Sequence, residues 1–221
     1  MKFTGLRRTP LRAPLRGFRQ PVRWRPPSLA LRVLLVVLFV GFVPGAACGP
    51  LDKERMIAGV RIYYAPRTDL RQIDLALLGS ARETIDIAAF ILSDRAIMEA
   101  LASAGRRGVK VRLYLDPDQP ALKGGAGRAA LVDLLRAPGV QAKVKTGEYL
   151  MHLKAYHADR RVLRTGSSNF SVSGGSRQNN DVILIESQDA IAGFVREFDY
   201  LWSLPDSQIM RADAIPETGQ R

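Results

Sequence analysis

Cysteine and histidine are scarce in this chain, which has one cysteine and two histidines among 221 residues. Because Cys48 is the single cysteine, the rest of the chain can form no disulfide bond and no cysteine-based metal site. Aromatic residues make up 7% of the chain, and the part after Cys48 shows neither an aromatic-rich loop nor an amphipathic helix suited to a membrane surface. The protein must therefore depend on its hydrophobic core, and its length is sufficient for one.

Acidic residues are missing from the first 51 positions, since Asp52 is the first of them. The same stretch holds nine of the 33 lysines and arginines, and without these nine the chain carries 24 basic and 21 acidic residues. Most of the net charge of +12 therefore belongs to a basic leader, which weakens the argument that charge alone gives for a nucleic-acid partner.

The leader contains an apolar run at 33–43, followed by the small residues Gly45, Ala46 and Ala47. Eleven apolar residues are typical of a signal peptide, whereas a membrane-spanning helix needs about 20. We expect export to the periplasm or the exterior after cleavage. The alternatives are membrane association through residues 33–47 or a lipid on Cys48. The predicted organisation is a leader at 1–48, a catalytic domain at 50–205 and a polar tail at 206–221.

Short apolar runs alternate with segments of helical periodicity from residue 58 onward. Strands are expected at 59–64, 84–92, 109–115, 140–145 and 182–185. Helices are expected from Leu70, from a cap at Ser93 to a stop at Gly105, at 128–136 and over 191–201. A hairpin is expected from 152–158 and 161–165, turning at Asp159. This pattern predicts an α/β fold of layers, with a mixed or mostly parallel central sheet flanked by helices.

Both histidines lie in one stretch, MHLKAYHADRRVLRTGSSN at 151–169. Side chains alternate along a strand, so His152 and Lys154 face one way, about 7 Å apart, and His157 faces the other. An imidazole beside an ammonium suits a phosphate, because imidazole can attack phosphorus or move a proton and lysine can neutralise the oxygens. Gly166, Ser167 and Asn169 follow and could approach or donate to the same oxygens.

Other sites fit this sequence less well. The two histidines face opposite ways and have few carboxylates nearby, so no metal site is expected. The residues around Ser167 lack the turn sequence of a serine hydrolase. The glycine-rich stretch 124–128 lacks the lysine that ends a phosphate-binding loop, which favours a flexible loop before a helix.

Six residues of this stretch have the spacing HxKx4Dx6GSxN, which is a motif of a known enzyme superfamily. They are His152, Lys154, Asp159, Gly166, Ser167 and Asn169. The chain therefore resembles the phospholipase D superfamily, over roughly residues 58 to 204. Only one copy of the motif is present. The resemblance is thus to the single-motif branch, which includes small bacterial endonucleases and mitochondrion-anchored relatives. It implies the phospholipase D-like fold and a homodimer in which two motifs form one active site.

The resemblance also implies a mechanism that needs no metal and no cofactor. His152 would attack phosphorus to form a phosphohistidine, and the partner subunit's His152 would protonate the leaving oxygen and then activate water. Lys154, Ser167 and Asn169 would hold the phosphate oxygens. Asp159, a catalytic-motif position at the hairpin corner, would orient the motif, and His157 would be structural.

The sequence departs from the family pattern at one position. Relatives often place a glutamate some ten residues after the motif to orient the histidine, and Asn180 stands there instead. Asp181 could replace it, or the orienting bond could come from the Asn180 amide.

Three functions are compatible with these features. A nuclease on DNA or RNA is favoured by the single motif and by residues 105–164, which carry 13 basic and 5 acidic residues and could steer a polyanion toward the histidines. The uneven charge could equally mark two solvated faces. A phospholipase D acting on phosphatidylcholine-type lipids is the alternative, and a non-catalytic phosphate-binding module is the third.

Overall fold

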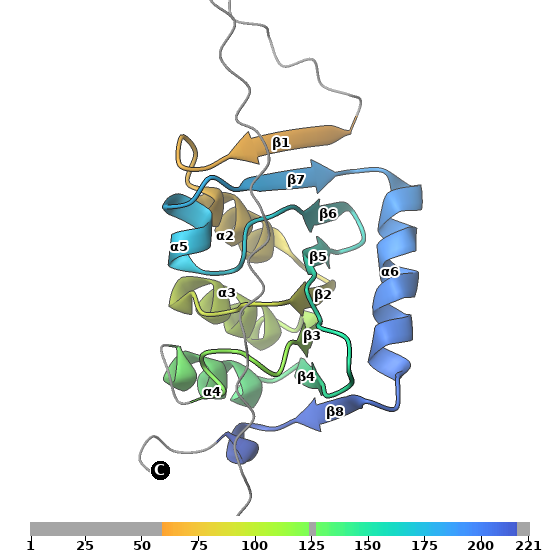
Figure 1. Ribbon diagram of the computed structural model, residues 1–221. Coiled ribbons are helices and arrows are strands. Elements are labelled where there is room, and N and C mark those ends of the chain that lie inside the picture. Colours follow the sequence, from red (N-terminus) through yellow and green to blue (C-terminus); the bar gives the residue numbers. More distant parts are fainter. Residues whose placement is uncertain (1–58, 124–126, 216–221) are drawn as a thin grey trace, which may run out of the picture. The chain divides into compact units, whose positions relative to one another are not determined.

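The computed structural model describes residues 59–123 and 127–215, so the predictions about the leader lie outside the described residues. Within these ranges no helix is long and apolar enough to cross a bilayer. The described chain forms one eight-stranded sheet in the order β1-β7-β6-β5-β2-β3-β4-β8 (Figure 1). The strands are β1 (Val60–Tyr64), β2 (Thr84–Ala89), β3 (Lys110–Leu115), β4 (Val140–Lys145), β5 (Lys154–Ala158), β6 (Val162–Thr165), β7 (Asp181–Ile185) and β8 (Ser207–Met210).

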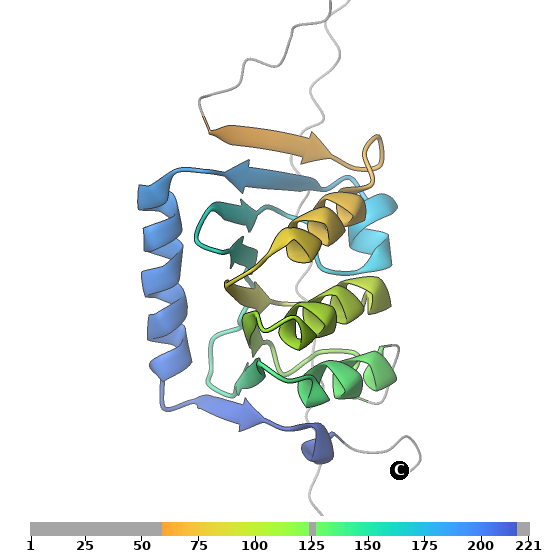
Figure 2. The same cartoon turned by 180° about the vertical axis from the view of Figure 1, so that it is seen from behind.

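The predicted α/β fold with a mixed sheet is confirmed. Strands β2, β3 and β4 are mutually parallel, and the other neighbouring pairs are antiparallel. Figures 1 and 2 show α6 on one face of the sheet and the other helices on the opposite face. These helices are α2 (Leu70–Ser80), α3 (Arg95–Arg106), α4 (Arg128–Arg136), α5 (Val172–Ser176) and α6 (Gln188–Ser203), and a 3-10 turn follows at Ala212–Ala214.

The central strand β2 is buried on both faces, which explains its nearly continuous apolar sequence. Ile85 and Ile87 belong to the main core together with apolar residues of α2, α3 and α4. Ala88 lies in a second cluster with Phe198 of α6. The sheet thus forms a rigid layer between two hydrophobic cores, and the ends of its strands are fixed in space.

Three local features differ from the prediction. The cap of α3 is Asp94, not Ser93, because the Asp94 carboxylate accepts from the backbone N–H of Ala96 (2.9 Å). Gly105 does not end α3 but lies inside it, where a Cβ would come within 2.4 Å of the Pro138 carbonyl oxygen. The predicted polar tail from 206 begins instead with β8, which pairs with β4 and covers an edge that would otherwise stay open.

The hairpin of β5 and β6 confirms the predicted turn at Asp159 and Arg160, whose φ angles are 54° and 52°. β5 also pairs with β2, and Lys154 lies opposite Ala89. Lys154 is therefore at the carboxyl end of β2, the end of the sheet from which the loop to α3 departs.

Candidate active site

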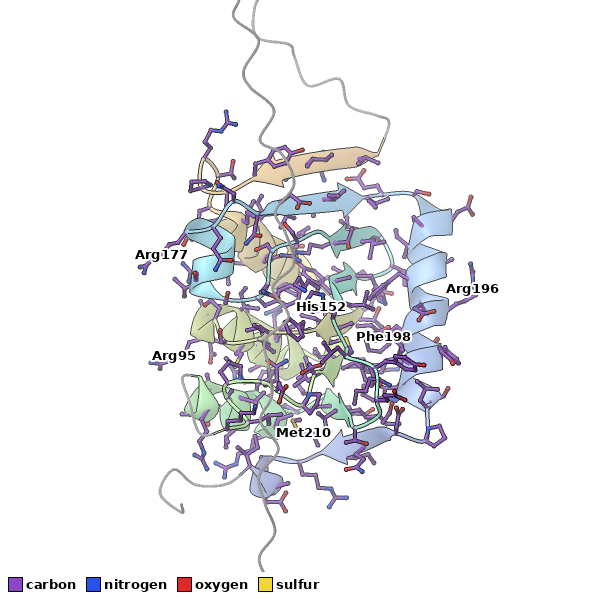
Figure 3. All side chains as sticks on the ribbon, in the orientation of Figure 1. Arg95, His152, Arg177, Arg196, Phe198 and Met210 are labelled. Carbon is purple, nitrogen blue, oxygen red and sulfur yellow. The ribbon has the colours of Figure 1, made fainter. Side chains whose placement is uncertain are left out.

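His152 and Lys154 lie on the same side of the chain, as predicted, although β5 begins only at Lys154. The Lys154 Nζ is 3.3 Å from His152 Nδ1 and 3.4 Å from Nε2, and it donates to the His152 carbonyl oxygen at 2.9 Å. His152 is exposed, whereas Lys154 is half-buried. Figure 3 shows His152 near the middle of the view, between helix α3 and helix α6. An imidazole and an ammonium are thus held together and open to solvent.

The charge state of Lys154 reflects its surroundings. Burial lowers the pKa of Lys154 below its usual value, and the nearby Arg164 guanidinium lowers it further. Burial and like charge both disfavour the charged form of the lysine, so an anion bound at the Lys154 ammonium would stabilise that form. The site is therefore suited to a phosphate.

Phe90, which the sequence did not single out, forms the floor beneath both side chains. Its ring centroid is 4.2 Å from that of His152, and the Lys154 Nζ is 4.8 Å from it. The Phe90 backbone N–H donates to the Leu153 carbonyl at 2.9 Å, which joins the end of β2 to the segment that carries the histidine.

The return loop brings Gly166, Ser167 and Asn169 to the same end of the sheet. Gly166 has φ 136°, and a Cβ there would come within 2.5 Å of the Asp181 carbonyl oxygen, so only glycine fits. The Asn169 side-chain amide makes no hydrogen bond within the described residues, although its Oδ1 is buried. The unpartnered atom is the carbonyl oxygen, which accepts. A contact with phosphate oxygens would therefore use the Nδ2 group, and that predicted contact stays a prediction.

Ser167 and Asp181 bond to each other. The Ser167 hydroxyl donates to Asp181 Oδ1 and accepts from the Asp181 backbone N–H at 2.9 Å. Asn180 donates through Nδ2 to the Gly174 carbonyl (2.9 Å) and to Gln178 Oε1 (3.1 Å). Within the described part of this chain neither Asn180 nor Asp181 contacts the His152 ring. The structure thus places Asn180 in the neighbouring loop and Asp181 at the start of β7.

Asp159 fixes the hairpin corner. Its carboxylate accepts from the backbone N–H groups of Arg82, Glu83 and Thr84 at 2.7–3.1 Å. Burial alone would raise the pKa of Asp159, but these three donors, with Arg161, lower it below its usual value. Asp159 lies at the other end of β5 from Lys154, so it supports the strand and does not reach the site.

His157 points away from His152, as predicted, and is fully buried. Its Nε2 is 2.8 Å from Asp86 Oδ2, and its Nδ1 accepts from the Arg160 backbone N–H at 3.3 Å. Arg112 also binds the Asp86 carboxylate, through Nε at 2.6 Å and Nη2 at 2.7 Å. The burial of His157 and its bond to Asp86 agree with the predicted structural role.

Arg164 connects the strand of Lys154 to the loop of Ser168, and no pattern in the sequence pointed to this residue. The side chain is fully buried and binds Asp74 of α2 with Nε (2.9 Å) and Nη2 (3.0 Å). Its Nη1 donates to the carbonyl oxygens of Lys154 (2.9 Å) and Ser168 (3.1 Å). Tyr156 adds a hydrogen bond to Asp74 at 3.0 Å. One guanidinium thereby ties the strand of Lys154 to the loop of Ser167 and Asn169.

The chain segment around His152 exposes more apolar surface than the sequence suggested. Tyr149 is 78% exposed and Leu150 66%, and Leu153 is also exposed, so three exposed apolar side chains lie within three positions of His152 in the sequence. Three basic residues of 105–164 lie far from His152. Lys110 pairs with Thr84 at the start of β2, and Arg160 and Arg161 are in the hairpin turn. These three residues therefore lie at the other end of the sheet from His152.

Among the described residues no group of three or more histidine, cysteine, aspartate or glutamate side chains could hold a metal ion.

Comparison with known proteins identifies a family and several relatives. The family model of the PLD-like domain of cardiolipin synthase matches residues 75–202. Mitochondrial cardiolipin hydrolase of Homo sapiens is 31% identical over 128 residues, which are 58% of this chain and 49% of that protein. Phospholipase D of Rickettsia prowazekii is 29% identical over 146 residues, 66% of this chain and 69% of that protein. The chain spans about half the length of the cardiolipin hydrolases that it matches.

Among solved structures, Nuc of Salmonella typhimurium, a phospholipase D family member, has a TM-score of 0.62 at 24% identity. The match covers 69% of this chain and 97% of Nuc. NucT from Helicobacter pylori has a TM-score of 0.58 at 17% identity and covers 68% of this chain and 98% of NucT. These likenesses show a shared fold. Together with the family match over more than half of the sequence, they show that the chain belongs to the phospholipase D superfamily of phosphodiesterases.

Proposed function

We propose that this protein hydrolyses phosphodiester bonds without a metal ion, with His152 as nucleophile. The observation that carries the proposal is the contact of the Lys154 ammonium with an exposed imidazole, at 3.3 and 3.4 Å from its two nitrogens. The Lys154 ammonium and the Asn169 Nδ2 group would bind the non-bridging oxygens as negative charge develops there.

The reaction proceeds in two balanced steps. A His152 ring nitrogen forms a bond to phosphorus while the bond from phosphorus to the leaving oxygen breaks, and the partner subunit's His152 gives its proton to that oxygen. The partner subunit's His152 then takes a proton from water, whose oxygen displaces the first histidine from phosphorus. Two copies of the chain are required because the described chain brings only one exposed histidine to the site.

Nucleic acid is the substrate that we favour. The site opens at the surface, where a polymer can reach it, and Tyr149, five positions before Lys154 in the sequence, is exposed. An exposed aromatic ring next to positive charge is the usual arrangement for holding single-stranded nucleic acid, because bases stack on the ring. The proposed setting is outside the cytoplasm, after removal of the leader, or at a membrane through residues 33–47 or a lipidated Cys48.

Phospholipid is the second candidate, and the exposed Leu150 and Leu153 beside Tyr149 favour it. Such side chains can enter the headgroup region of a bilayer. Two relatives carry the names cardiolipin hydrolase and phospholipase D, which agrees with a lipid substrate.

The test is hydrolysis by the purified full-length chain in EDTA. The substrates are labelled single- and double-stranded oligonucleotides, and vesicles of phosphatidylcholine or cardiolipin. We expect cleavage of oligonucleotides at a rate that EDTA does not change. Loss of activity in EDTA that Mg²⁺ restores would contradict the proposed metal-free chemistry. Release of lipid headgroups while the oligonucleotides stay intact would contradict nucleic acid as the substrate and favour a phospholipase.

Tyr149→Ser should raise the KM for single-stranded oligonucleotides about tenfold, because base stacking on an aromatic ring contributes about 1–3 kcal/mol per base. Leu150→Ser is the matched control, since it removes a neighbouring exposed apolar side chain that cannot stack, and its KM should stay within about twofold of the original. Steady-state kinetics on a labelled oligonucleotide measure both. Equal effects of the two substitutions would contradict a stacking role.

A further inference from the structure

The orientation of the His152 ring needs an explanation, because the position expected to supply a carboxylate holds Asn180. Asn180 bonds to Gly174 and Gln178, and Asp181 bonds to Ser167. The polar and aromatic contacts of the His152 ring within the described residues are with Lys154 and with Phe90. Because Lys154 is also proposed to bind substrate, Phe90 is the neighbour that can support the ring throughout the reaction.

The geometry of the Phe90 contact is close. The two ring centroids lie 4.2 Å apart with an interplanar angle of 52°, which is packing at van der Waals distance. The same ring has the Lys154 Nζ 4.8 Å from its centroid, a cation–π distance. One aromatic side chain thereby touches both of the groups that act on phosphate.

Phe90 is itself held firmly by a buried amide. Gln119, fully buried, donates through Nε2 to the carbonyl oxygens of Ala89 (2.8 Å) and Phe90 (2.5 Å). Its Oε1 accepts from the Leu92 backbone N–H at 2.7 Å. The Phe90 N–H binds the Leu153 carbonyl, next to the histidine in sequence. Because the backbone around Phe90 is fixed on both sides, the ring is a preorganised support.

We propose that Phe90 is the positioning residue of His152, and that its ring, rather than a carboxylate, sets the orientation from which the imidazole attacks phosphorus. This inference rests on the proposed function of His152. An error of about 1 Å in the position of a reacting group can cost about 100-fold in rate. Removing the aromatic surface should therefore lower kcat strongly. KM should change much less, because Lys154 loses its cation–π contact with Phe90 but keeps its hydrogen bond to the His152 carbonyl oxygen.

The experiment compares Phe90→Leu, Phe90→Tyr and the original protein on bis(p-nitrophenyl) phosphate, a small diester that does not depend on the natural substrate. Phe90→Leu should lower kcat about 100-fold and leave KM within about threefold of the original value. Phe90→Tyr keeps the aromatic ring, so its kcat should stay within about threefold of the original value. Phe194→Leu is the matched control, because Phe194 packs on the structural His157 (6.2 Å between centroids) and its loss should leave kcat unchanged. A loss confined to KM, or equal loss in Phe90→Leu and Phe90→Tyr, would overturn the inference.

A second measurement does not depend on activity. The chain has only two histidines, so the imidazole NMR signals of His152 and His157 can be resolved and assigned by substitution. In Phe90→Leu the His152 signals should move toward those of a free imidazole while the His157 signals stay in place. If the original protein hydrolyses no diester but this change occurs, the proposed function fails and the positioning contact stands. Unchanged His152 signals would overturn the positioning role.

Discussion

His152→Ala should lower kcat by about 10⁴-fold or more on every diester that the protein cleaves. The substitution removes the nucleophile, and removing a nucleophile typically costs far more than removing a proton donor or a single hydrogen bond. In a shared site it would also remove the general acid, so no histidine would remain to carry either step. The measurement is single-turnover hydrolysis of an oligonucleotide in EDTA.

The fold should survive this substitution. His152 is exposed and lies before the start of β5, where side chains contribute little to the core, so the free energy of unfolding should change by less than about 0.5 kcal/mol. His157→Ala is the opposite control. It removes a buried partner of Asp86 and should destabilise the protein. Activity of His152→Ala near the original level would contradict the mechanism.

Mixing the two proteins tests the shared site. After subunit exchange with an excess of His152→Ala, most remaining original chains would have an inactive partner, and a site that needs two histidines would then lose activity far beyond simple dilution. Activity that follows only the amount of original protein would show that each chain works alone. Size-exclusion chromatography with light scattering supplies the oligomeric state on which this interpretation depends.

The sequence predicts those parts of the fold that depend on local patterns. Helix α4 at Arg128–Arg136 and strand β4 at Val140–Lys145 have the predicted bounds, because apolar periodicity and the Pro138-Gly139 turn are visible in the residues themselves. The hairpin turn at Asp159 is predictable for the same reason. Strand β8 is not, because four residues with one apolar pair are too short for a pattern, and only the open edge of β4 gives them a strand partner.

The residues of the candidate site also fall into two groups, those that the sequence predicts and those that only the structure reveals. Fixed spacing reveals His152, Lys154 and Asn169, because they lie on one hairpin and its loop. Phe90 and Arg164 have no such signal, since each acts through contacts with distant segments: Phe90 from the end of β2 and Arg164 through Asp74 of α2. From the sequence alone, an arginine on a short strand is expected at the surface. Its burial becomes predictable only when the carboxylate that pairs with it is known.

Arg164→Leu should destabilise the protein by about 3–5 kcal/mol, because it leaves the Asp74 carboxylate buried without its partner. Burial already raises the pKa of Asp74 despite the bonds from Arg164 and Tyr156, so the loss of the guanidinium would favour the protonated acid. Thermal unfolding followed by circular dichroism should show a Tm lower by roughly 10 °C, since each kcal/mol corresponds to about 2–4 °C in a domain of this size.

The double substitution Arg164→Leu with Asp74→Leu separates the two roles of Arg164. Removing both charges leaves no unpaired ion in the core, so a large part of the lost Tm should return. The remaining deficit reflects the buried Tyr156 hydroxyl, which loses its acceptor on Asp74. Activity should not return, because Nη1 of Arg164 also joins the carbonyl oxygens of Lys154 and Ser168, and leucine cannot replace those bonds. The strand of Lys154 and the loop of Asn169 would then shift relative to each other. A double variant that regains both stability and activity would show that Arg164 serves the core alone.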